Sequence, residues 1–193
     1  YIEFLFQYTR CSRPGWATGP MKNYLKELYI KLSMNYYNII AQSYNELHKK
    51  EQIGKINIII KNLNLKNDEK ILDIGCGTAI YSNLFKNYIG IDSSKKMLSQ
   101  SNANVIYGKA EKLPFKDKSF DVVISVTAIH NFKNSVKAIN EIKRVGKNKV
   151  AITLLKKSNN FTKLKNLIRN NFEVKEFDSE KDLIFIGSIK NTK

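Results

Sequence analysis

The sequence has 193 residues, a formal net charge of +16 and 42% hydrophobic residues. This length is that of a single domain with a sizeable core. No apolar run reaches the roughly 20 residues of a membrane-spanning helix, and no segment resembles a signal peptide. The two cysteines, Cys11 and Cys76, do not make a disulfide framework, so we expect a cytoplasmic protein and no membrane partner.

The positive charge has two interpretations. An excess of cations attracts polyanions such as RNA. However, nearly all of these cations are lysines, they are scattered along the chain, and Asn and Ile are also abundant, as expected for an A/T-rich genome. The composition therefore leaves RNA binding open and does not establish it.

The first 66 residues divide into two segments. Residues 1–20 hold the only Trp, Trp16, and two of the three Pro, so we expect a non-native or dispensable extension, with a specific N-terminal arm as the alternative. Residues 21–66 predict an N-terminal helical segment, and residues 67–193 the core domain. Apolar residues at helical spacing in this segment are Leu25, Leu28, Tyr29, Leu32, Ile53, Ile56, Ile60 and Leu63.

The chain is organised around residues 71–79, which read Ile-Leu-Asp-Ile-Gly-Cys-Gly-Thr-Ala. An apolar strand here turns at Gly75 and Gly77 into a predicted helix. Glycines allow the backbone to turn sharply and to approach a ligand closely. A second strand ends at Asp92, where a carboxylate can accept hydrogen bonds from both hydroxyls of a ribose. These features together predict a nucleoside site.

The motif disfavours a dinucleotide. A G-x-G-x-x-G fingerprint would need its third glycine at Ile80, where a branched residue stands. Asp73, two residues before the first glycine, would repel a diphosphate. A carboxylate in that place suits a ligand that carries an ammonium group.

The remaining elements follow in alternation. Ser93 and Ser94 offer an N-cap to a short helix, and residues 120–126, which include Ser125, predict a central strand that ends beside the ligand. Tyr81, Leu84 and Phe85 are expected to form the buried face of the helix after the glycines. Further strands are predicted at residues 104–108, 149–155, 172–177 and 182–189, and further helices around residues 136–142 and 161–168.

Asp-x-Gly-x-Gly with a second strand-end acid resembles the cofactor site of class I S-adenosylmethionine-dependent methyltransferases, with Ala79 where the family usually has Gly. Tyr37, Ala41 and Tyr44 resemble a pattern that precedes the core in ubiquinone-biosynthesis-type members of this family. The resemblance implies an α/β, doubly wound, Rossmann-like sheet of seven mostly parallel strands, with an antiparallel last strand and an N-terminal helical lid.

The resemblance also implies S-adenosylmethionine as the cofactor and a set of residues that bind it. Glu111 would receive the adenine amino group, although Asp is more usual there, and the backbone of Ala110 would read the ring. Tyr37 and Tyr44 would lie over the methionine end. The full implied set is Tyr37, Tyr44, Asp73, Gly75, Cys76, Gly77, Asp92, Ser93, Ala110, Glu111 and Ser125.

Methyl transfer from a sulfonium depends mainly on the alignment of the nucleophile, so the sequence need not carry a strong catalytic signature. His130 is the candidate general base, because an imidazole titrates near neutral pH; a histidine that only packs in the acceptor wall is the alternative. No cluster with metal-ligand spacing is present, so we expect no metal.

The acceptor is left open by the sequence. It is a small metabolite or RNA, because residues 124–130 also resemble eukaryotic tRNA wobble-uridine-modifying methyltransferases. A non-catalytic S-adenosylmethionine-binding or scaffold module is a further alternative. The sequence does not indicate an oligomeric state.

Overall fold

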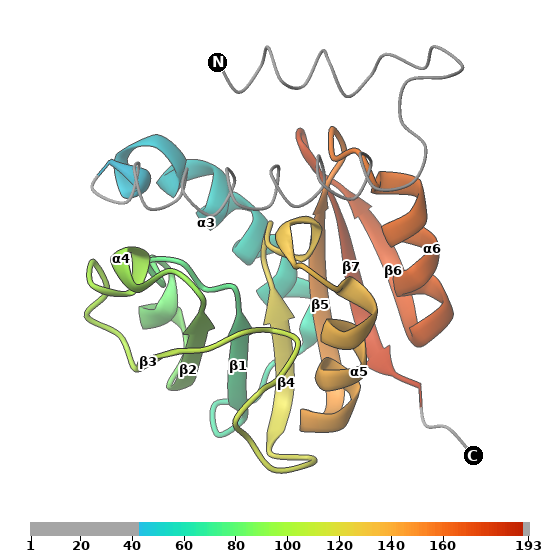
Figure 1. The fold of residues 1–193 in the computed structure, drawn as a ribbon, viewed down its shortest axis with the longest axis horizontal. Helices are drawn as coiled ribbons and strands as arrows, with labels where there is room; N and C mark the ends of the chain where they lie inside the picture. The colour runs from blue at the N-terminus through green and yellow to red at the C-terminus, as the bar shows by residue number, and fades with distance from the viewer. Residues whose placement is uncertain (1–42, 191–193) are drawn as a thin grey trace, which may run out of the picture. The chain divides into compact units, whose positions relative to one another are not determined.

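The structure is a computed structural model that describes residues 43–190 (Figure 1). Within this range a seven-stranded sheet has the order β3-β2-β1-β4-β5-β7-β6. Strands β1 to β5 run parallel to one another, and β7 is antiparallel to both β5 and β6. The predicted doubly wound sheet with its antiparallel last strand is confirmed. The predictions for residues 1–20, for the first stripe of residues 21–32 and for Tyr37 fall outside the described residues.

The strands are β1 (Lys70–Ile74), β2 (Asn87–Asp92), β3 (Val105–Tyr107), β4 (Phe120–Ser125), β5 (Gly146–Leu155), β6 (Phe172–Asp178) and β7 (Asp182–Ile189). The helices are α3 (Tyr44–Leu63), α4 (Lys95–Leu98), α5 (Ser135–Val145) and α6 (Phe161–Asn171), with 3-10 turns η1 (Ser82–Leu84) and η2 (Ile129–Asn131). Apart from η1, each described element lies within a few residues of its prediction.

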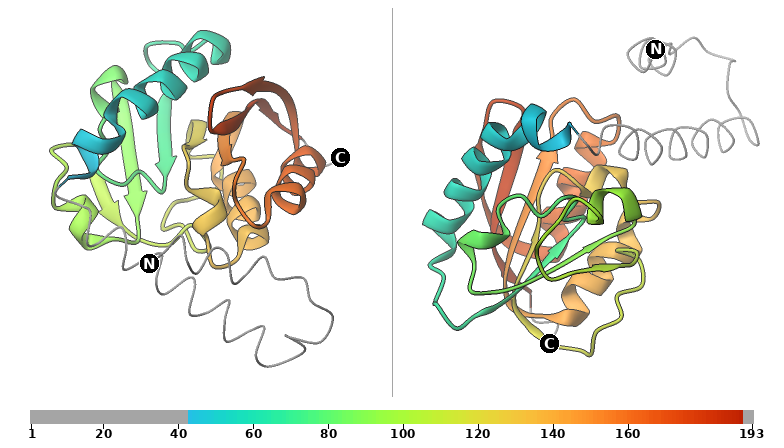
Figure 2. Two further views of the ribbon diagram at one scale, coloured as in Figure 1. Left: turned by 90° about the horizontal axis from the view of Figure 1, so that it is seen from above. Right: turned by 90° about the vertical axis from the view of Figure 1, so that its left-hand side faces the viewer.

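Helices cover both faces of the sheet. Helix α3 lies on one face, and α5 and α6 lie on the other (Figure 2). On the α3 face, Ile56, Ile59 and Leu63 are buried against strands of the sheet. This part of the predicted N-terminal helical segment therefore contributes to the core.

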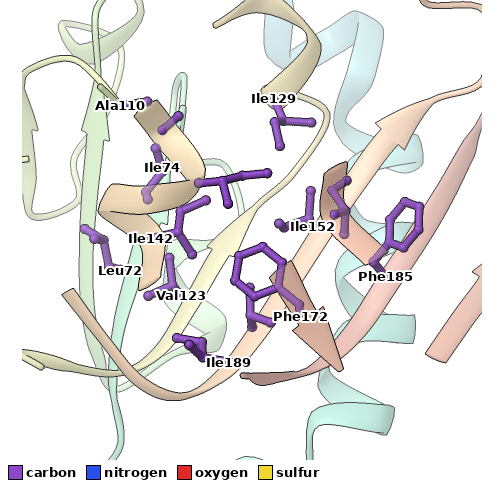
Figure 3. Close-up of a cluster of buried hydrophobic side chains, with 14 of the residues drawn as sticks. Leu72, Ile74, Ala110, Val123, Ile129, Ile142, Ile152, Phe172, Phe185 and Ile189 are labelled. Atoms are coloured by element: carbon purple, nitrogen blue, oxygen red, sulfur yellow. The ribbon is translucent and has the colours of Figure 1, made fainter. Parts of the chain in front are cut away.

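The opposite face holds the larger part of the core. Leu72, Val123 and Ile152 project from β1, β4 and β5 and pack against Ile142 of α5 and Phe172 at the start of β6 (Figure 3). Helix α5 forms because Asn134 caps it, with its side-chain oxygen accepting from the backbone N–H of Lys137 at 3.1 Å. This core fixes the strand ends that carry the site.

The prediction of a helix after the glycine turn is wrong. Residues 75–86 join β1 to β2 and form only the 3-10 turn η1. This connection is too short for the glycine turn and a helix of several turns. Tyr81 and Phe85 are buried as predicted, but Leu84 is 45% exposed. No α-helix N-terminus therefore follows the glycines to bind a ligand.

Candidate functional site

Two loops meet at the point where the strand order reverses, between β1 and β4. The glycine loop (residues 75–79) follows β1, and the β4 loop (residues 126–132) follows β4. Gly75 has a φ of +77°, and a Cβ at this position would lie 2.4 Å from Cβ of Ala128. Only glycine fits here, for both reasons. Doubly wound sheets bind ligands in such a crevice, beyond the carboxyl ends of the strands.

The glycine loop has no spare backbone donors at four of its positions. The N–H groups of Gly75 and Cys76 both donate to the carbonyl oxygen of Ile91, at 2.8 and 3.2 Å. Gly77 donates to Asp92, and Ala79 donates to the carbonyl oxygen of Cys76 at 2.9 Å. A phosphate-binding loop needs free N–H groups. The loop is therefore unsuited to a diphosphate, in agreement with the argument from Ile80.

Asp92 lies at the end of β2 and faces the glycine loop. Its Oδ2 accepts from the N–H of Gly77 at 2.8 Å, and its Oδ1 accepts from the N–H of Ser94 at 2.7 Å. Burial raises the pKa of Asp92, while the N–H groups of Ser94, Gly77 and Ser93 lower it. Each carboxylate oxygen can accept two hydrogen bonds, so beside these three N–H groups the half-buried side chain keeps one acceptor position for a hydroxyl group.

Asp73 is placed differently, because its side chain is fully buried. Its Oδ2 accepts from the hydroxyl of Tyr88 at 2.7 Å. Burial raises the pKa of Asp73 to about 7, against the hydrogen bonds from Tyr88 and Tyr81 that lower it. The carboxyl group is held inside the protein by these tyrosines, and its burial leaves it no direct contact with the ammonium group of a ligand.

Two other predicted residues also turn into the protein. The hydroxyl of Ser125, which is fully buried, donates to the carbonyl oxygen of Ile74 at 2.9 Å and joins the ends of β4 and β1. Cys76 is buried beside Gly90, where an added Cβ would lie 2.6 Å from its sulfur. Burial raises the pKa of the Cys76 thiol, so it stays protonated. Only the backbone of Cys76 can line the crevice.

The loop after β3 reaches the same edge of the sheet. Ala110 is buried near Ile74 (Figure 3). Oε1 of Glu111 accepts from the backbone N–H of Asn134 at 3.0 Å, which ties this loop to the start of α5. The other carboxylate oxygen of Glu111 makes no hydrogen bond to the described residues. Of the two predicted lid tyrosines, Tyr44 begins α3, and its side chain is outside the described part of the chain.

Asn45 was missed by the sequence argument. Its Oδ1 accepts from the hydroxyl of Thr78 at 2.6 Å, so the first turn of α3 is joined to the glycine loop. The available signal was its place directly after Tyr44 in the predicted lid pattern.

His130 lies in η2, on the β4 loop. Its Nδ1 is buried and has no hydrogen-bond partner among the described residues, and its Nε2 lies 3.3 Å from Nδ2 of Asn131. Burial, and then the charge of Lys55, lower the pKa of His130 to about 4. The imidazole is therefore neutral near pH 7. Because Nδ2 of Asn131 can only donate, Nε2 is the acceptor in this arrangement and the ring proton lies on Nδ1.

A buried polar cluster lies behind the β4 loop. Lys55 of α3 has a side chain only 1% exposed, and its Nζ donates to Oε1 of Glu51 at 2.6 Å and to Oγ1 of Thr127 at 2.9 Å. It also pairs with the fully buried Asp182 at the start of β7. We call Lys55, Glu51, Thr127 and Asp182 the Lys55 cluster. Lys55 lies four residues before Ile59, on the buried face of α3. This helical spacing is the signal in the sequence that indicates the burial of Lys55.

Two hollows lie away from this crevice. One, of about 400 Å³, has Lys118, Arg144 and Lys190 among its walls; the other, of about 780 Å³, lies over β6 and β7. Lys118 donates to the carbonyl oxygen of Gly146 at 3.0 Å, and Lys190 donates to that of Arg169 at 3.0 Å. These lysines close the carboxyl ends of α5 and α6, so the first hollow is a structural feature.

Among residues 43–190, no helix is both long and apolar enough to cross a membrane. Over the same residues, no group of three or more His, Cys, Asp or Glu side chains could hold a metal ion.

Comparison with known proteins defines the class. A methyltransferase domain family matches residues 72–154. The uncharacterized protein MJ1252 of Methanocaldococcus jannaschii is 36% identical over 114 residues, which cover 57% of this chain and 45% of the relative. A demethylmenaquinone methyltransferase of Thermotoga maritima is 31% identical over 140 residues, which cover 65% of this chain and 61% of the relative. The chain spans about half the length of the curated relatives that it matches.

Solved structures share the fold. An S-adenosylmethionine-dependent methyltransferase of Aquifex aeolicus has a TM-score of 0.68 at 17% identity and covers 79% of this chain and 98% of its own. A chain from the complex of the Haloferax volcanii Trm112 methyltransferase activator with a methyltransferase has the same score at 14% identity, covering 80% of this chain and 98% of its own. The fold and the glycine loop are thus those of class I S-adenosylmethionine-dependent methyltransferases. Residues 72–154 belong to the methyltransferase domain family.

Proposed function

We propose that this protein binds S-adenosylmethionine in the crevice at the carboxyl ends of β1, β2 and β4 and transfers its methyl group to a nucleophile held against the β4 loop. The observation that carries the proposal is the pairing of Asp92 with a glycine loop whose donors are already used. This pairing offers a carboxylate acceptor for a ribose hydroxyl and, at four of the five loop positions, no free N–H for a diphosphate. It therefore fits a nucleoside with a cationic sulfonium.

The residues of this chain have separate parts in the proposed reaction. Asp92 would hold the ribose, and Glu111 with the backbone of Ala110 would hold the adenine. When bound, the cofactor would supply an electrophilic methyl group, so the protein has to orient the acceptor and exclude water. His130, neutral near pH 7, would take the proton from an N–H or O–H nucleophile.

The acceptor has two candidates. The relative named demethylmenaquinone methyltransferase suggests a quinone acceptor. RNA is the second candidate, because four exposed lysines lie on the loops after β3 and β4 and on the first turn of α5, form no ion pair with a described residue, and would attract phosphates. These lysines are Lys109, Lys112, Lys133 and Lys137. An activator protein is a further proposed partner, since a structural neighbour occurs in a complex with Trm112.

Calorimetry tests cofactor binding. We expect S-adenosylmethionine and its demethylated product to bind with micromolar-scale affinity, and Asp92→Ala to weaken this binding about 100-fold, because each charge-assisted hydrogen bond contributes roughly 1.5–3 kcal/mol. Asp121→Ala is the matched control, since Asp121 also accepts a backbone N–H, that of Lys70 at 2.9 Å, and lies at the opposite edge of the sheet. Unchanged affinity in the Asp92 variant would refute the site.

Transfer of labelled methyl from the cofactor tests catalysis and the acceptor together. Cell extract should be separated into RNA and metabolite fractions. Label in unmodified RNA supports the RNA candidate, and label only in the metabolite fraction excludes it. Cofactor binding without transfer to either fraction would favour the non-catalytic binding module.

A further inference from the structure

We propose that Lys55 is a positioning residue, which fastens α3 to Thr127 and thereby fixes the β4 loop that carries His130. The inference rests on the proposed function in one respect, that the β4 loop is the acceptor side of the crevice. The placement itself follows from contacts among described residues.

One ammonium group joins three parts of the fold. Nζ of Lys55 has three N–H donors, and its three partners are Glu51 on α3, Thr127 on the β4 loop and Asp182 at the start of β7. Every donor is therefore used within the protein. Lys55 and Asp182 are almost completely buried, so water does not compete for these contacts.

Thr127 is held in a conformation that needs support. Its φ is +55°, in the left-handed region, where a β-branched residue is an outlier that persists only when its surroundings hold it. Its N–H donates to Oγ1 of Thr153 at 2.6 Å, and its own Oγ1 lies 3.2 Å from the same atom. Lys55 supplies the remaining contact, from the other side. The turn at Thr127 sets the direction in which the β4 loop leaves the sheet.

The residues after Thr127 connect this turn to the crevice. Ala128 lies against Gly75 of the glycine loop, and Ile129 is fully buried. His130 follows directly, with its Nδ1 buried and unpartnered. The β4 loop is thus tied to α3 at Thr127 and abuts the glycine loop at Ala128. These two contacts fix the distance between His130 and the crevice.

Stability alone does not account for a buried ion pair. Replacing both partners of such a pair by apolar residues of similar size is often neutral or stabilising, whereas removing one partner leaves a buried charge and is strongly destabilising. The pair is therefore explained better by what it positions. The charged and titratable groups around it are His48, Glu51, Lys156, Lys181, Asp182 and His130.

The titration of His130 by NMR is the test, and the chain suits it because it has only two histidines. A His48→Gln spectrum assigns the signals. Two variants release the β4 loop, and Thr127→Val decides the test because it keeps the charge of Lys55, which itself lowers the pKa of His130. Thr127→Val removes the hydroxyl that Lys55 binds, and Lys55→Met with Asp182→Leu removes both buried charges. In the wild type we expect a pKa of about 4, set mainly by burial.

In both variants the pKa of His130 should rise by at least one unit toward 6.5, because a released loop exposes the imidazole to water. Lys149→Met is the matched control. Lys149 also fastens α3, through the carbonyl oxygen of Asn64 at 2.6 Å, but at the other edge of the sheet. This control should leave the titration of His130 unchanged. A titration that stays within 0.3 units of wild type in both test variants, on the order of 0.4 kcal/mol, would overturn the proposal.

Cofactor affinity separates this proposal from the proposed function. Both test variants should bind S-adenosylmethionine within about threefold of wild type, since none of the cofactor-side contacts changes. A wild type that fails to bind the cofactor refutes the proposed function and leaves the titration result valid. A variant that loses cofactor binding while the titration of His130 is unchanged shows a general structural role for the Lys55 cluster and overturns the positioning role.

Discussion

The proposed cofactor half of the crevice and its acceptor half are built from different ranges of the sequence. Gly75, Gly77, Asp92 and Glu111 lie on three consecutive loops, and each is oriented by a backbone group nearby. In the acceptor half, the side chains of Lys55, Thr127 and Asp182 meet from segments more than 50 residues apart. The first half is a local property of the chain, and the second exists only after the whole sheet has formed.

The largest expected effect is at the junction of the two halves. Gly75→Ala forces a positive φ on a residue with a Cβ and brings this atom against Ala128. We expect the free energy of unfolding to fall by about 2–5 kcal/mol, from about 1–2 for the left-handed conformation and about 1–3 for overpacking. Urea denaturation measures this loss, and cofactor binding should fall with it.

Two further variants separate the causes. Gly75→Ala with Ala128→Gly removes the overpacking and should recover that part of the loss alone. Gly54→Ala in α3 has no atom within 4 Å of the new Cβ, so it should stabilise the protein by roughly 0.5–1 kcal/mol. If Gly75→Ala is as stable as wild type, the two loops do not touch as described.

The halves also respond to pH in opposite directions. The pKa of His130 is lowered from 6.5 to about 4, so the unfolded state binds more protons between these values, and stability falls as the pH is lowered through this range. The pKa of Asp73 is raised from 3.8 to about 7, so the folded state binds more protons there, and stability rises as the pH is lowered. The contribution of His130 amounts to about 3 kcal/mol and that of Asp73 to about 4 kcal/mol, so the two largely cancel.

Single variants reveal this cancellation. His130→Asn removes the contribution of the imidazole. When the pH is lowered from 6.5 to 4, the free energy of unfolding of this variant should therefore rise by about 3 kcal/mol relative to that of the wild type. Asp73→Asn should lose a similar amount over the same range. Denaturation at several pH values measures both, and His48→Asn, at a half-buried position of α3, is the control with a smaller effect. Parallel curves for wild type and His130→Asn would contradict the burial of the imidazole.

The sequence predicted the proposed cofactor half better than the acceptor half, because the cofactor half is a local property of the chain. The glycines and Asp92 follow from a short pattern, because backbone sterics and one ribose acceptor suffice to specify them. The sequence pattern did not show that the connection after Gly77 is too short for a helix. It also did not show that Asp73 is buried, because its partner Tyr88 lies on the next strand. The Lys55 cluster involves a partner 127 residues away in the chain, and helical spacing alone shows only that Lys55 is buried.

The smallest expected effect concerns Glu111, which ties the loop after β3 to the start of α5 on the proposed cofactor side. Glu111→Gln keeps an oxygen for the N–H of Asn134 and replaces the other oxygen by an amide N–H₂ group, which donates. Stability should therefore stay within about 0.5 kcal/mol of wild type, since the replaced oxygen makes no hydrogen bond to the described residues. Affinity for the demethylated cofactor should fall about five- to tenfold, because the adenine amino group loses its acceptor.

The analogue that carries inosine in place of adenosine makes the test specific. It has an oxygen where adenine has the amino group, so wild type should bind it more weakly than the adenosine compound, and Glu111→Gln should lose or reverse this preference. Glu111→Ala should lose the preference too and also some stability, about 0.5–1 kcal/mol, with the bond to Asn134. If Glu111→Gln keeps the full preference for the amino group, the adenine is recognised by other residues, and the cofactor half extends beyond the three loops that the sequence predicts.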